Sequence, residues 1–185
     1  MKNQEENLIH SSKKYFKSYK FLSAWDPLDE NNSLSPKIVV TCFIQQKDKI
    51  LILQRARKDL QHNLWGIPGG KLDRNESPKQ GLIREIKEEI DASISSKDFS
   101  LLGTARSTTI SDGEYGLYLF YALMPENQII KINHEEHSGF CWVTLEEFES
   151  YDLLTAQGEA YHFVENKLKK IYKSNSQKFK GVCNV

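Results

Sequence analysis

The sequence has no surplus of charge of either sign. Its 185 residues include 25 Lys and Arg and 25 Asp and Glu, so the formal net charge is zero. Proteins that bind nucleic acid or an anionic membrane surface usually carry a basic excess. The balance therefore gives no support to either class of partner, and we expect neither nucleic acid nor a membrane.

Long apolar runs are missing as well, and we expect no secretory leader. The longest apolar runs, KIVVTCFI and KILIL, have the length of a strand and are far too short to cross a bilayer. The first twenty residues are polar and include acids, which is unlike a secretory signal.

Cysteine is scarce. Cys42, Cys141 and Cys183 are far apart and odd in number, and no CxxC pair occurs. The pattern therefore predicts neither a zinc site nor a disulfide framework. Reduced thiols fit it best, so we predict a cytoplasmic protein. Cys42 and Cys141 stand in apolar stretches and are expected in the core.

The composition divides the chain into three parts. Residues 1–36 predict an N-terminal extension with a linker, because residues 26–36 are rich in Pro, Asn, Ser and acids. Residues 37–173 predict one globular domain, and residues 174–185 predict a polar tail. The extension carries five aromatic residues in YFKSYKFLSAW. So much aromatic surface is expected to pack on the domain or on a second subunit, which makes the extension a candidate homodimer surface.

Strands are predicted by segments rich in β-branched and aromatic residues. KIVVTCFIQ and KILILQR, with QKD between them, predict a hairpin. FSLLGTARS, EYGLYLFYALM and GFCWVTL predict three further strands.

Two longer helices are predicted. The first runs from Pro78 to about Ile90, with Ser77 as its N-cap and Gln80 completing a capping box. An amphipathic helix is expected to close the domain over residues 156–173, and a short helix is expected to begin at TLEEF. The order of strands and helices predicts an α+β fold rather than a doubly wound array.

Six residues of the first helix, REIKEE at positions 84–89, include three glutamates. At about 100° per residue, Glu85, Glu88 and Glu89 share one side of the helix, next to the apolar arc that would face a sheet. One interpretation is a solvated face that the two basic residues neutralise. The other is a cation site, because hard divalent cations bind carboxylate oxygens.

The residues upstream favour the cation site. The loop PGGKLDRNE places Gly69 and Gly70 shortly before the helix, and glycines let backbone groups approach a ligand closely. Glu76 adds one more acid just before the helix start. The loop and the helix are thus placed to hold a phosphate and a metal together.

This stretch resembles the Nudix box, the signature of the Nudix hydrolase family. The box has Gly, five residues, Glu, seven residues, Arg-Glu, an aliphatic residue, any residue, Glu-Glu, any residue, Gly and an aliphatic residue. The matching positions here are Gly70, Glu76, Arg84, Glu85, Ile86, Glu88 and Glu89. Asp91 replaces the glycine, where we expect a backbone of positive φ, and Ala92 takes the last aliphatic place.

The resemblance covers about residues 37–172 and implies an α/β/α sandwich with a mixed central sheet. It also implies a hydrolase that depends on Mg²⁺, with Mn²⁺ as the alternative. Such an enzyme cleaves the diphosphate of a nucleoside diphosphate linked to another group, by attack of water on phosphorus. The expected partner is then a small-molecule nucleotide: a nucleotide sugar, a nucleoside triphosphate or a dinucleoside polyphosphate.

The resemblance also implies roles for single residues. The implied metal ligands are the carboxylates of Glu85, Glu88 and Glu89 and the carbonyl of Gly69. Arg84 is expected to orient a glutamate, first of all Glu85, and Glu76 is expected to support the site.

The general base stays open. Glu89 and Glu85 rank first, followed by Glu136, on the loop before the strand that contains Trp142. His137, beside Glu136, is a further candidate for a base or a ligand, against the alternative of an exposed loop histidine.

Four residues are candidates for substrate contacts. Arg55 and Lys71 would bind phosphate, and Trp65 and Tyr118 would stack on a base. Each has a plain alternative, which is a solvated charge at a strand end for the first two and a core aromatic for the others.

Three other functions stay open. The region from HSGFCWVTLEEF to HFVENKL vaguely resembles GDP-mannose hydrolases, which attack a sugar carbon, but those have an altered box, whereas this one keeps its Arg-Glu and Glu-Glu pairs. A non-catalytic nucleotide-binding or regulatory module on the Nudix fold would usually lose box glutamates. A helical partner-binding protein would use the aromatic residues of the extension.

Overall fold

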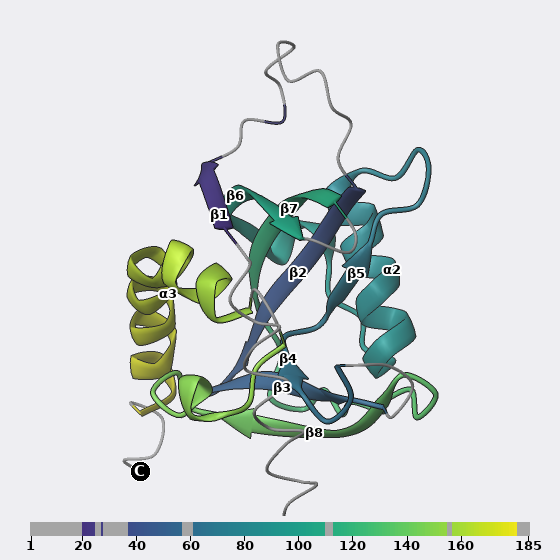
Figure 1. The fold of residues 1–185 in the computed structure, drawn as a ribbon. Helices are drawn as coiled ribbons and strands as arrows, with labels where there is room; N and C mark the ends of the chain where they lie inside the picture. The colour runs from purple at the N-terminus through teal and green to yellow at the C-terminus, as the bar shows by residue number, and fades with distance from the viewer. Residues whose placement is uncertain are drawn as a thin grey trace, which may run out of the picture.

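The structure is a computed structural model that describes residues 20–24, 27, 37–56, 61–109, 113–154 and 157–180. Within these residues, an eight-stranded sheet lies between two helices, one on each side (Figure 1). The helices are α2 (Pro78–Ile90) and α3 (Gln157–Lys180), with two short 3-10 helices, η2 (Ser96–Asp98) and η3 (Phe148–Ser150). The strands are β1 (Lys20–Ala24), β2 (Lys37–Gln46), β3 (Lys49–Arg55), β4 (Trp65–Gly66), β5 (Gly69–Lys71), β6 (Phe99–Thr109), β7 (Gly113–Leu123) and β8 (His137–Val143).

The sheet is mixed, as expected. Its order is β1-β6-β7-β2-β3-β4, with β5 paired to β2 and β8 paired to β3. The central strands β2 and β7 run parallel, from the pair Lys37↔Tyr115 to the pair Gln45↔Leu123, whereas β5 runs antiparallel along β2. This confirms the predicted α+β sandwich, and it places the glycines of β5 at the centre of the sheet.

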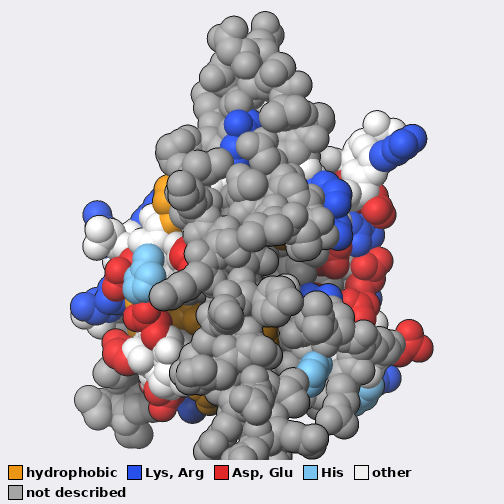
Figure 2. All heavy atoms as spheres, viewed as in Figure 1, with side chains coloured by type: hydrophobic (Ala, Val, Ile, Leu, Met, Phe, Trp, Pro, Cys, Tyr) orange, Lys and Arg blue, Asp and Glu red, His pale blue; other side chains and the backbone are white. Residues whose placement is uncertain are grey.

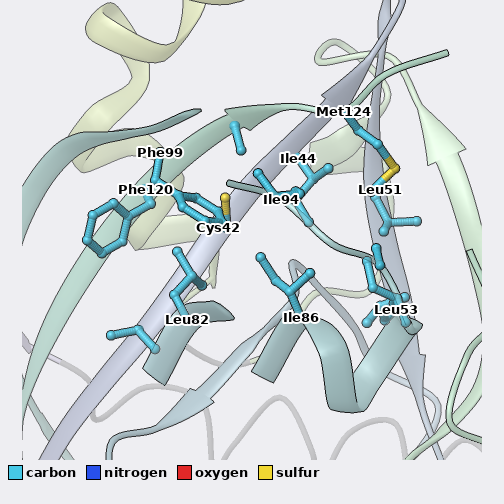
Figure 3. Packing of buried hydrophobic residues seen from close by; sticks show 14 of the residues in the cluster. Cys42, Ile44, Leu51, Leu53, Leu82, Ile86, Ile94, Phe99, Phe120 and Met124 are labelled. Carbon is cyan, nitrogen blue, oxygen red and sulfur yellow. The ribbon is translucent and has the colours of Figure 1, made fainter. Parts of the chain in front are cut away.

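Side chains alternate along β2 between the two faces of the sheet. Val40, Cys42 and Ile44 belong to the core cluster that includes Leu82 and Ile86 of α2 (Figure 3). Phe43 points to the other face, into the cluster that contains residues of α3. Both faces of the strand are buried, which explains its nearly continuous apolar sequence.

The predicted hairpin forms, but its ladder is short. The turn has Lys47 at φ 57°, and β2 and β3 pair only through Gln45↔Ile50 and Gln46↔Lys49. Beyond the turn the two strands take different partners, because β2 pairs with β5 and β7 while β3 pairs with β4 and β8.

Both ends of α2 follow the sequence prediction. Ser77 caps the N-terminus, Pro78 is in the first turn, and the reciprocal bonds of the capping box with Gln80 are present. At the C-terminus, Asp91 takes the left-handed conformation at φ 50° and forms an ion pair with Lys87. The helix therefore ends at Asp91, the position at which the Nudix box has a glycine.

The closing helix α3 begins near the predicted start but continues to Lys180, beyond the expected end at residue 173. Its C-terminal half is bonded to the sheet through Gln45, whose amide donates to the carbonyl of Tyr172 and to the hydroxyl of Ser176. The short helix expected from TLEEF is only the 3-10 turn η3.

Part of the predicted N-terminal extension joins the sheet. The backbone of β1 pairs antiparallel with β6 at one edge. Most of the aromatic residues of the extension lie outside the described residues, so the expected dimer surface stays a prediction.

Two expectations from the composition concern burial. Cys42 is fully buried, as predicted, and Cys141 is only partly buried. Among the helices that the structure describes, none combines the length and the apolar character needed to cross a membrane.

Candidate functional site

A cavity of about 670 Å³ lies against β2, β5 and β7 and extends to the start of α3. One part of its lining is charged: Arg55, Lys71, Glu85, Glu89, Glu136 and His137. Another part is mostly apolar: Val39, Leu117, Leu119, Leu154 and Ala160. The cavity thus combines a charged end with an apolar wall.

Two adjacent glycines form the backbone beneath the charged end. Gly69 has φ +147°, and a Cβ there would lie 2.1 Å from the carbonyl oxygen of Val40. A Cβ on Gly70 would lie 2.4 Å from the carboxyl carbon of Glu85. The first glycine lets β5 lie against β2, and the second makes room for a carboxylate directly above the chain.

Glu89 is the most deeply buried of the acids on α2, with 5% of its surface exposed. Its Oε2 accepts a hydrogen bond of 2.8 Å from the backbone N–H of Gly69, and its Oε1 lies 3.0 Å from Nε2 of His137. Burial raises the pKa of its carboxyl, although both partners favour the charged form. A cation in the cavity would stabilise the charged form of a buried carboxylate of this kind.

Glu85 lies one turn earlier on α2 and also faces the cavity. Burial raises the pKa of its carboxyl, and the nearby charge of Glu89 acts in the same direction. Arg84 opposes this shift by donating a bond of 2.9 Å from Nη1 to Oε1 of Glu85. Arg84 therefore contacts Glu85, and its role in orienting that glutamate stays a prediction.

The strongest contact of Arg84 is with Glu76. Nε donates to Oε1 at 2.8 Å and Nη2 donates to Oε2 at 2.9 Å, which is a two-bond ion pair. This pair lowers the pKa of Glu76 to about 2, helped by the backbone N–H of Asp73. Nη2 also donates to the carbonyl of Lys71, so Arg84 connects the helix to the glycine loop.

Glu88 occupies a different place from Glu85 and Glu89. Its side chain is 52% exposed, and Nη1 of Arg84 donates to it at 3.0 Å. Figure 2 shows acidic and basic side chains mixed over the edge of the molecule where α2 lies. The structure thus brings Glu85 and Glu89 together at the cavity and places Glu88 on the exposed side of the helix.

Glu136 and His137 lie next to Glu89 at the charged end of the cavity. One ligand atom from each of the three residues lies within 4.8 Å of the others. The side chain of His137 is only 11% exposed, because the residue begins β8 instead of lying in a loop. Its Nδ1 is buried and has no hydrogen-bond partner among the described residues.

The four predicted substrate residues fall into two groups. Arg55 and Lys71 line the charged end of the cavity. Tyr118 points to the other face of the sheet, where it packs on the α2 core and stacks on Phe120. Trp65 packs edge-on against Tyr151, and neither it nor Tyr118 is part of the cavity lining.

The lining also includes polar residues that the sequence did not indicate, among them Thr41 on β2, Tyr115 on β7 and Gln157 at the start of α3. The period of two along a strand places Thr41 on the same face of β2 as Val39, and Tyr115 on the same face of β7 as Leu117 and Leu119. To recognise that these two faces form one wall requires the parallel register of the two strands, which the sequence does not contain.

The side chains at the charged end fit a hard divalent cation. Glu85 and Glu89 are carboxylates whose burial penalises the charged form, and a cation removes that penalty. Carboxylate oxygens are the preferred ligands of Mg²⁺ and Mn²⁺, and a histidine nitrogen also suits Mn²⁺ better than Mg²⁺.

The comparisons with known proteins agree with this geometry. The family model described as "NUDIX domain" matches residues 35–166. Over 126 residues, the chain is 29% identical to the nucleoside triphosphatase NudI of Escherichia coli K12, covering 63% of this chain and 89% of that protein.

Two further similarities are weaker in coverage or identity. The chain is 30% identical to a nucleoside triphosphate pyrophosphatase/Nudix hydrolase fusion protein of Bifidobacterium longum over 58% of its own length, but it spans only 22% of that protein. The crystal structure of a MutT protein from Methanosarcina mazei has a TM-score of 0.62 at 23% identity, covering 74% of this chain and 99% of that one.

The match to the family model spans most of the chain and contains the glycines, the arginine and the glutamates of the site. The solved MutT structure has the same fold. The chain therefore belongs to the Nudix hydrolase family.

Proposed function

We propose that the protein is a metal-dependent pyrophosphohydrolase that cleaves the diphosphate linkage of a nucleoside diphosphate joined to another group. The observation that carries the proposal is the burial of Glu85 and Glu89 side by side at one end of the cavity, above Gly69 and Gly70. Buried like charges are unfavourable unless the site binds a cation.

The residues that would hold the cation are Glu85 and Glu89, and His137 is a further candidate because its Nε2 lies 3.0 Å from Oε1 of Glu89. The carbonyl of Gly69 and Glu88 are the remaining candidates from the box. A bound Mg²⁺ or Mn²⁺ would supply positive charge for the diphosphate oxygens and make a nearby water more acidic.

Arg84 acts through the glutamates. Its guanidinium bonds to Glu76, Glu85 and Glu88, so it fixes the position of Glu85 relative to the glycine loop. Arg55 and Lys71 contribute positive charge at the same end of the cavity, where the substrate phosphates would lie.

Glu136 is our candidate for the general base. It lies at the cavity and its side chain is exposed, so water reaches it, while Glu85 and Glu89 are committed to the cation. Asn133 Nδ2 donates to Oε1 of Glu136 at 3.0 Å and holds the carboxylate in place. A carboxylate in this position can take the proton of the attacking water.

The test is a panel of nucleoside triphosphates, nucleotide sugars and dinucleoside polyphosphates with Mg²⁺ or Mn²⁺, read by product mass in ¹⁸O-labelled water. We expect ¹⁸O in a phosphate product, because water attacks phosphorus. Label in the sugar would instead identify a glycosyl hydrolase of the GDP-mannose type. A wild-type protein inactive on the whole panel with either metal would favour a binding module.

Two variants test separately the metal-binding role of Glu89 and the general-base role of Glu136. Glu89→Gln is expected to lower kcat by about 100-fold or more, since even the partners of metal ligands are worth 10- to 100-fold. Glu136→Gln is expected to lower kcat by about 10²- to 10⁴-fold, the usual range for a general base, and to retain cation binding by calorimetry. Full activity of Glu89→Gln would overturn the metal assignment, and full activity of Glu136→Gln would overturn the assignment of the base.

A further inference from the structure

We propose that Asn133 is a positioning residue that fixes the candidate base Glu136 relative to the buried Glu89, because it bonds to both of them. The proposal rests on the function proposed above, which makes Glu136 the base and Glu89 a cation ligand. It adds the part of the chain that sets the distance between the two carboxylates. That distance matters, because a displacement of about 1 Å at a reacting group can lower the rate by about 100-fold.

The loop before β8 is attached to the end of α2. The last carbonyls of a helix have no partner within the helix. Here the backbone N–H of Lys131 donates to the carbonyl of Ile90 at 2.9 Å, and that of Asn133 donates to the carbonyl of Glu89 at 2.8 Å. Between these two bonds, Ile132 is 8% exposed and belongs to the core cluster that contains α2 residues. The loop therefore leaves from a fixed point on the helix that carries the box glutamates.

Asn133 also forms the turn that leads to Glu136. Its carbonyl accepts the N–H of Glu136 at 3.1 Å and the N–H of His137 at 2.9 Å. Its side-chain Oδ1 accepts the N–H of Glu135 at 3.0 Å, and Nδ2 donates to Oε1 of Glu136 at 3.0 Å. An N–H can pair only with the amide oxygen, so the bond from Glu135 orients the NH₂ group for Glu136. Backbone and side chain of one residue thus connect α2 to the candidate base.

The side-chain bond acts against a repulsion. Glu136 and Glu89 have carboxylate oxygens within 4.8 Å of each other. Burial raises the pKa of the Glu89 carboxyl, and the charge of Glu136 acts in the same direction. The side chain of Glu136 is exposed, so it can turn into solvent to reduce this repulsion. Among the described residues, Nδ2 of Asn133 is the side-chain donor that keeps it at the cavity.

The experiment is a double-mutant cycle between Asn133 and Glu136. Asn133→Ala removes the amide but keeps the backbone N–H and carbonyl, through which the bonds to Glu89, Glu136 and His137 form. The rates of the wild type, Asn133→Ala, Glu136→Gln and the double variant are measured on the best substrate of the nucleotide panel.

A further variant tests the donor itself. Asn133→Asp has nearly the same shape and keeps an oxygen for the N–H of Glu135, but it replaces the donor to Glu136 with a negative charge. A residue that only shaped the turn would tolerate this change, whereas a residue that holds a carboxylate would not.

We expect Asn133→Ala to lower kcat by about 10-fold, the worth of one hydrogen bond to a charged group. KM should stay within about 2-fold, since Asn133 does not line the cavity. Asn133→Asp should lower kcat by about 100-fold, because the added charge repels Glu136 from its position. In the Glu136→Gln background, Asn133→Ala should change kcat by less than about 2-fold, because the group that it positions is gone.

Two controls separate positioning from general damage. Asn166→Ala makes the same substitution at an exposed site on α3 outside the cavity lining, and should leave kcat and KM unchanged. Calorimetry with Mg²⁺ or Mn²⁺ should give the same cation affinity for Asn133→Ala as for the wild type, because Glu85 and Glu89 are intact.

The outcomes separate this proposal from the proposed function. An equal loss of kcat from Asn133→Ala in both backgrounds would show that Asn133 acts independently of Glu136, and would overturn the positioning role alone. Full activity of Asn133→Ala, or a weaker cation affinity in it, would do the same. Full activity of Glu136→Gln would remove the base and the role of Asn133 together but leave the hydrolase. A wild type that hydrolyses no nucleotide would overturn both proposals.

Discussion

Arg84 and Glu76 form a two-bond ion pair that joins the middle of α2 to the loop before it, with N···O distances of 2.8 and 2.9 Å. The Nudix resemblance implied mainly a contact between Arg84 and Glu85, and that contact is present as a single bond. The arginine therefore positions a catalytic candidate while it is itself held by a residue outside the helix.

The Arg84–Glu76 pair predicts a pH-dependent contribution to stability. Because Arg84 lowers the pKa of Glu76 to about 2, ionised Glu76 stabilises the folded protein at every pH above the ordinary carboxyl range. This contribution is lost as the pH falls from about 4.5 toward about 2. Glu76→Gln should therefore have a lower Tm than the wild type at pH 7, and the difference should shrink below pH 4.5. A difference that stays constant between pH 7 and pH 3 would contradict the ion pair.

Alanine at the two glycine positions is expected to damage different properties, namely stability at Gly69 and activity at Gly70. In Gly69→Ala the Cβ meets backbone atoms of Val40 and Thr41, and the φ of +147° is strained for any side chain. We expect a loss of at least about 2 kcal/mol in the free energy of unfolding, measured by urea denaturation. In Gly70→Ala the three atoms nearest to the Cβ belong to the carboxylate of Glu85, at the flexible end of a side chain that can swing away.

Gly70→Ala should therefore fold with a Tm close to that of the wild type and still lose most of its activity, because Glu85 leaves its position. Circular dichroism and the hydrolysis assay measure the two effects on the same sample. The interpretation would be wrong if Gly70→Ala lost stability and activity together, as Gly69→Ala does.

Local features explain how far the sequence could predict the structure. The helix of the box, its capping box and the left-handed conformation of Asp91 follow from residues within a few positions of one another, and all are confirmed. The strands β6 and β7 were predicted for the same reason. The short strands β4 and β5 were missed, because glycine-rich segments carry no strand pattern.

The wall of the cavity could not be predicted in this way. The aromatic ring of Tyr118 makes it a candidate for stacking on a base, but the register of β7 turns Tyr115, Leu117 and Leu119 to the cavity and Tyr118 to the core. Gln157 lies far along the chain from Thr41, and only the packing of α3 on the sheet brings both to one site. Such contacts depend on tertiary structure and leave no local signal in the sequence.

The C-terminal cap of α2 predicts a difference between two small substitutions. Asp91 has φ 50° and pairs with Lys87 at an exposed site. Asp91→Ala loses the ion pair and places a residue poorly suited to this conformation, so we expect a lower Tm than that of the wild type. Asp91→Gly loses the same ion pair but fits the conformation freely, and should keep a Tm close to that of the wild type. Equal losses in thermal denaturation of the two variants would show that the backbone conformation contributes nothing.

The buried glutamates predict how cation removal changes stability. Burial raises the pKa of Glu85 and Glu89, so these carboxyls hold their protons more tightly in the folded protein than in the unfolded chain. Without a cation, their ionisation costs stability as the pH rises above the ordinary carboxyl range, and a bound cation removes this cost. In EDTA, Glu89→Gln should therefore gain stability relative to the wild type between pH 5 and pH 8.

Saturating Mg²⁺ should reverse this order, because the wild type binds the cation at Glu89 and the variant does not. The measurement is Tm by differential scanning calorimetry for both proteins in EDTA and in Mg²⁺, at pH 5 and pH 8. Glu126→Gln is the matched control, since Glu126 is 48% exposed and does not line the cavity. The control should keep most of the Mg²⁺-dependent gain in Tm. If Glu89→Gln gained as much from Mg²⁺ as the wild type does, the cation would have to bind elsewhere than at the buried pair.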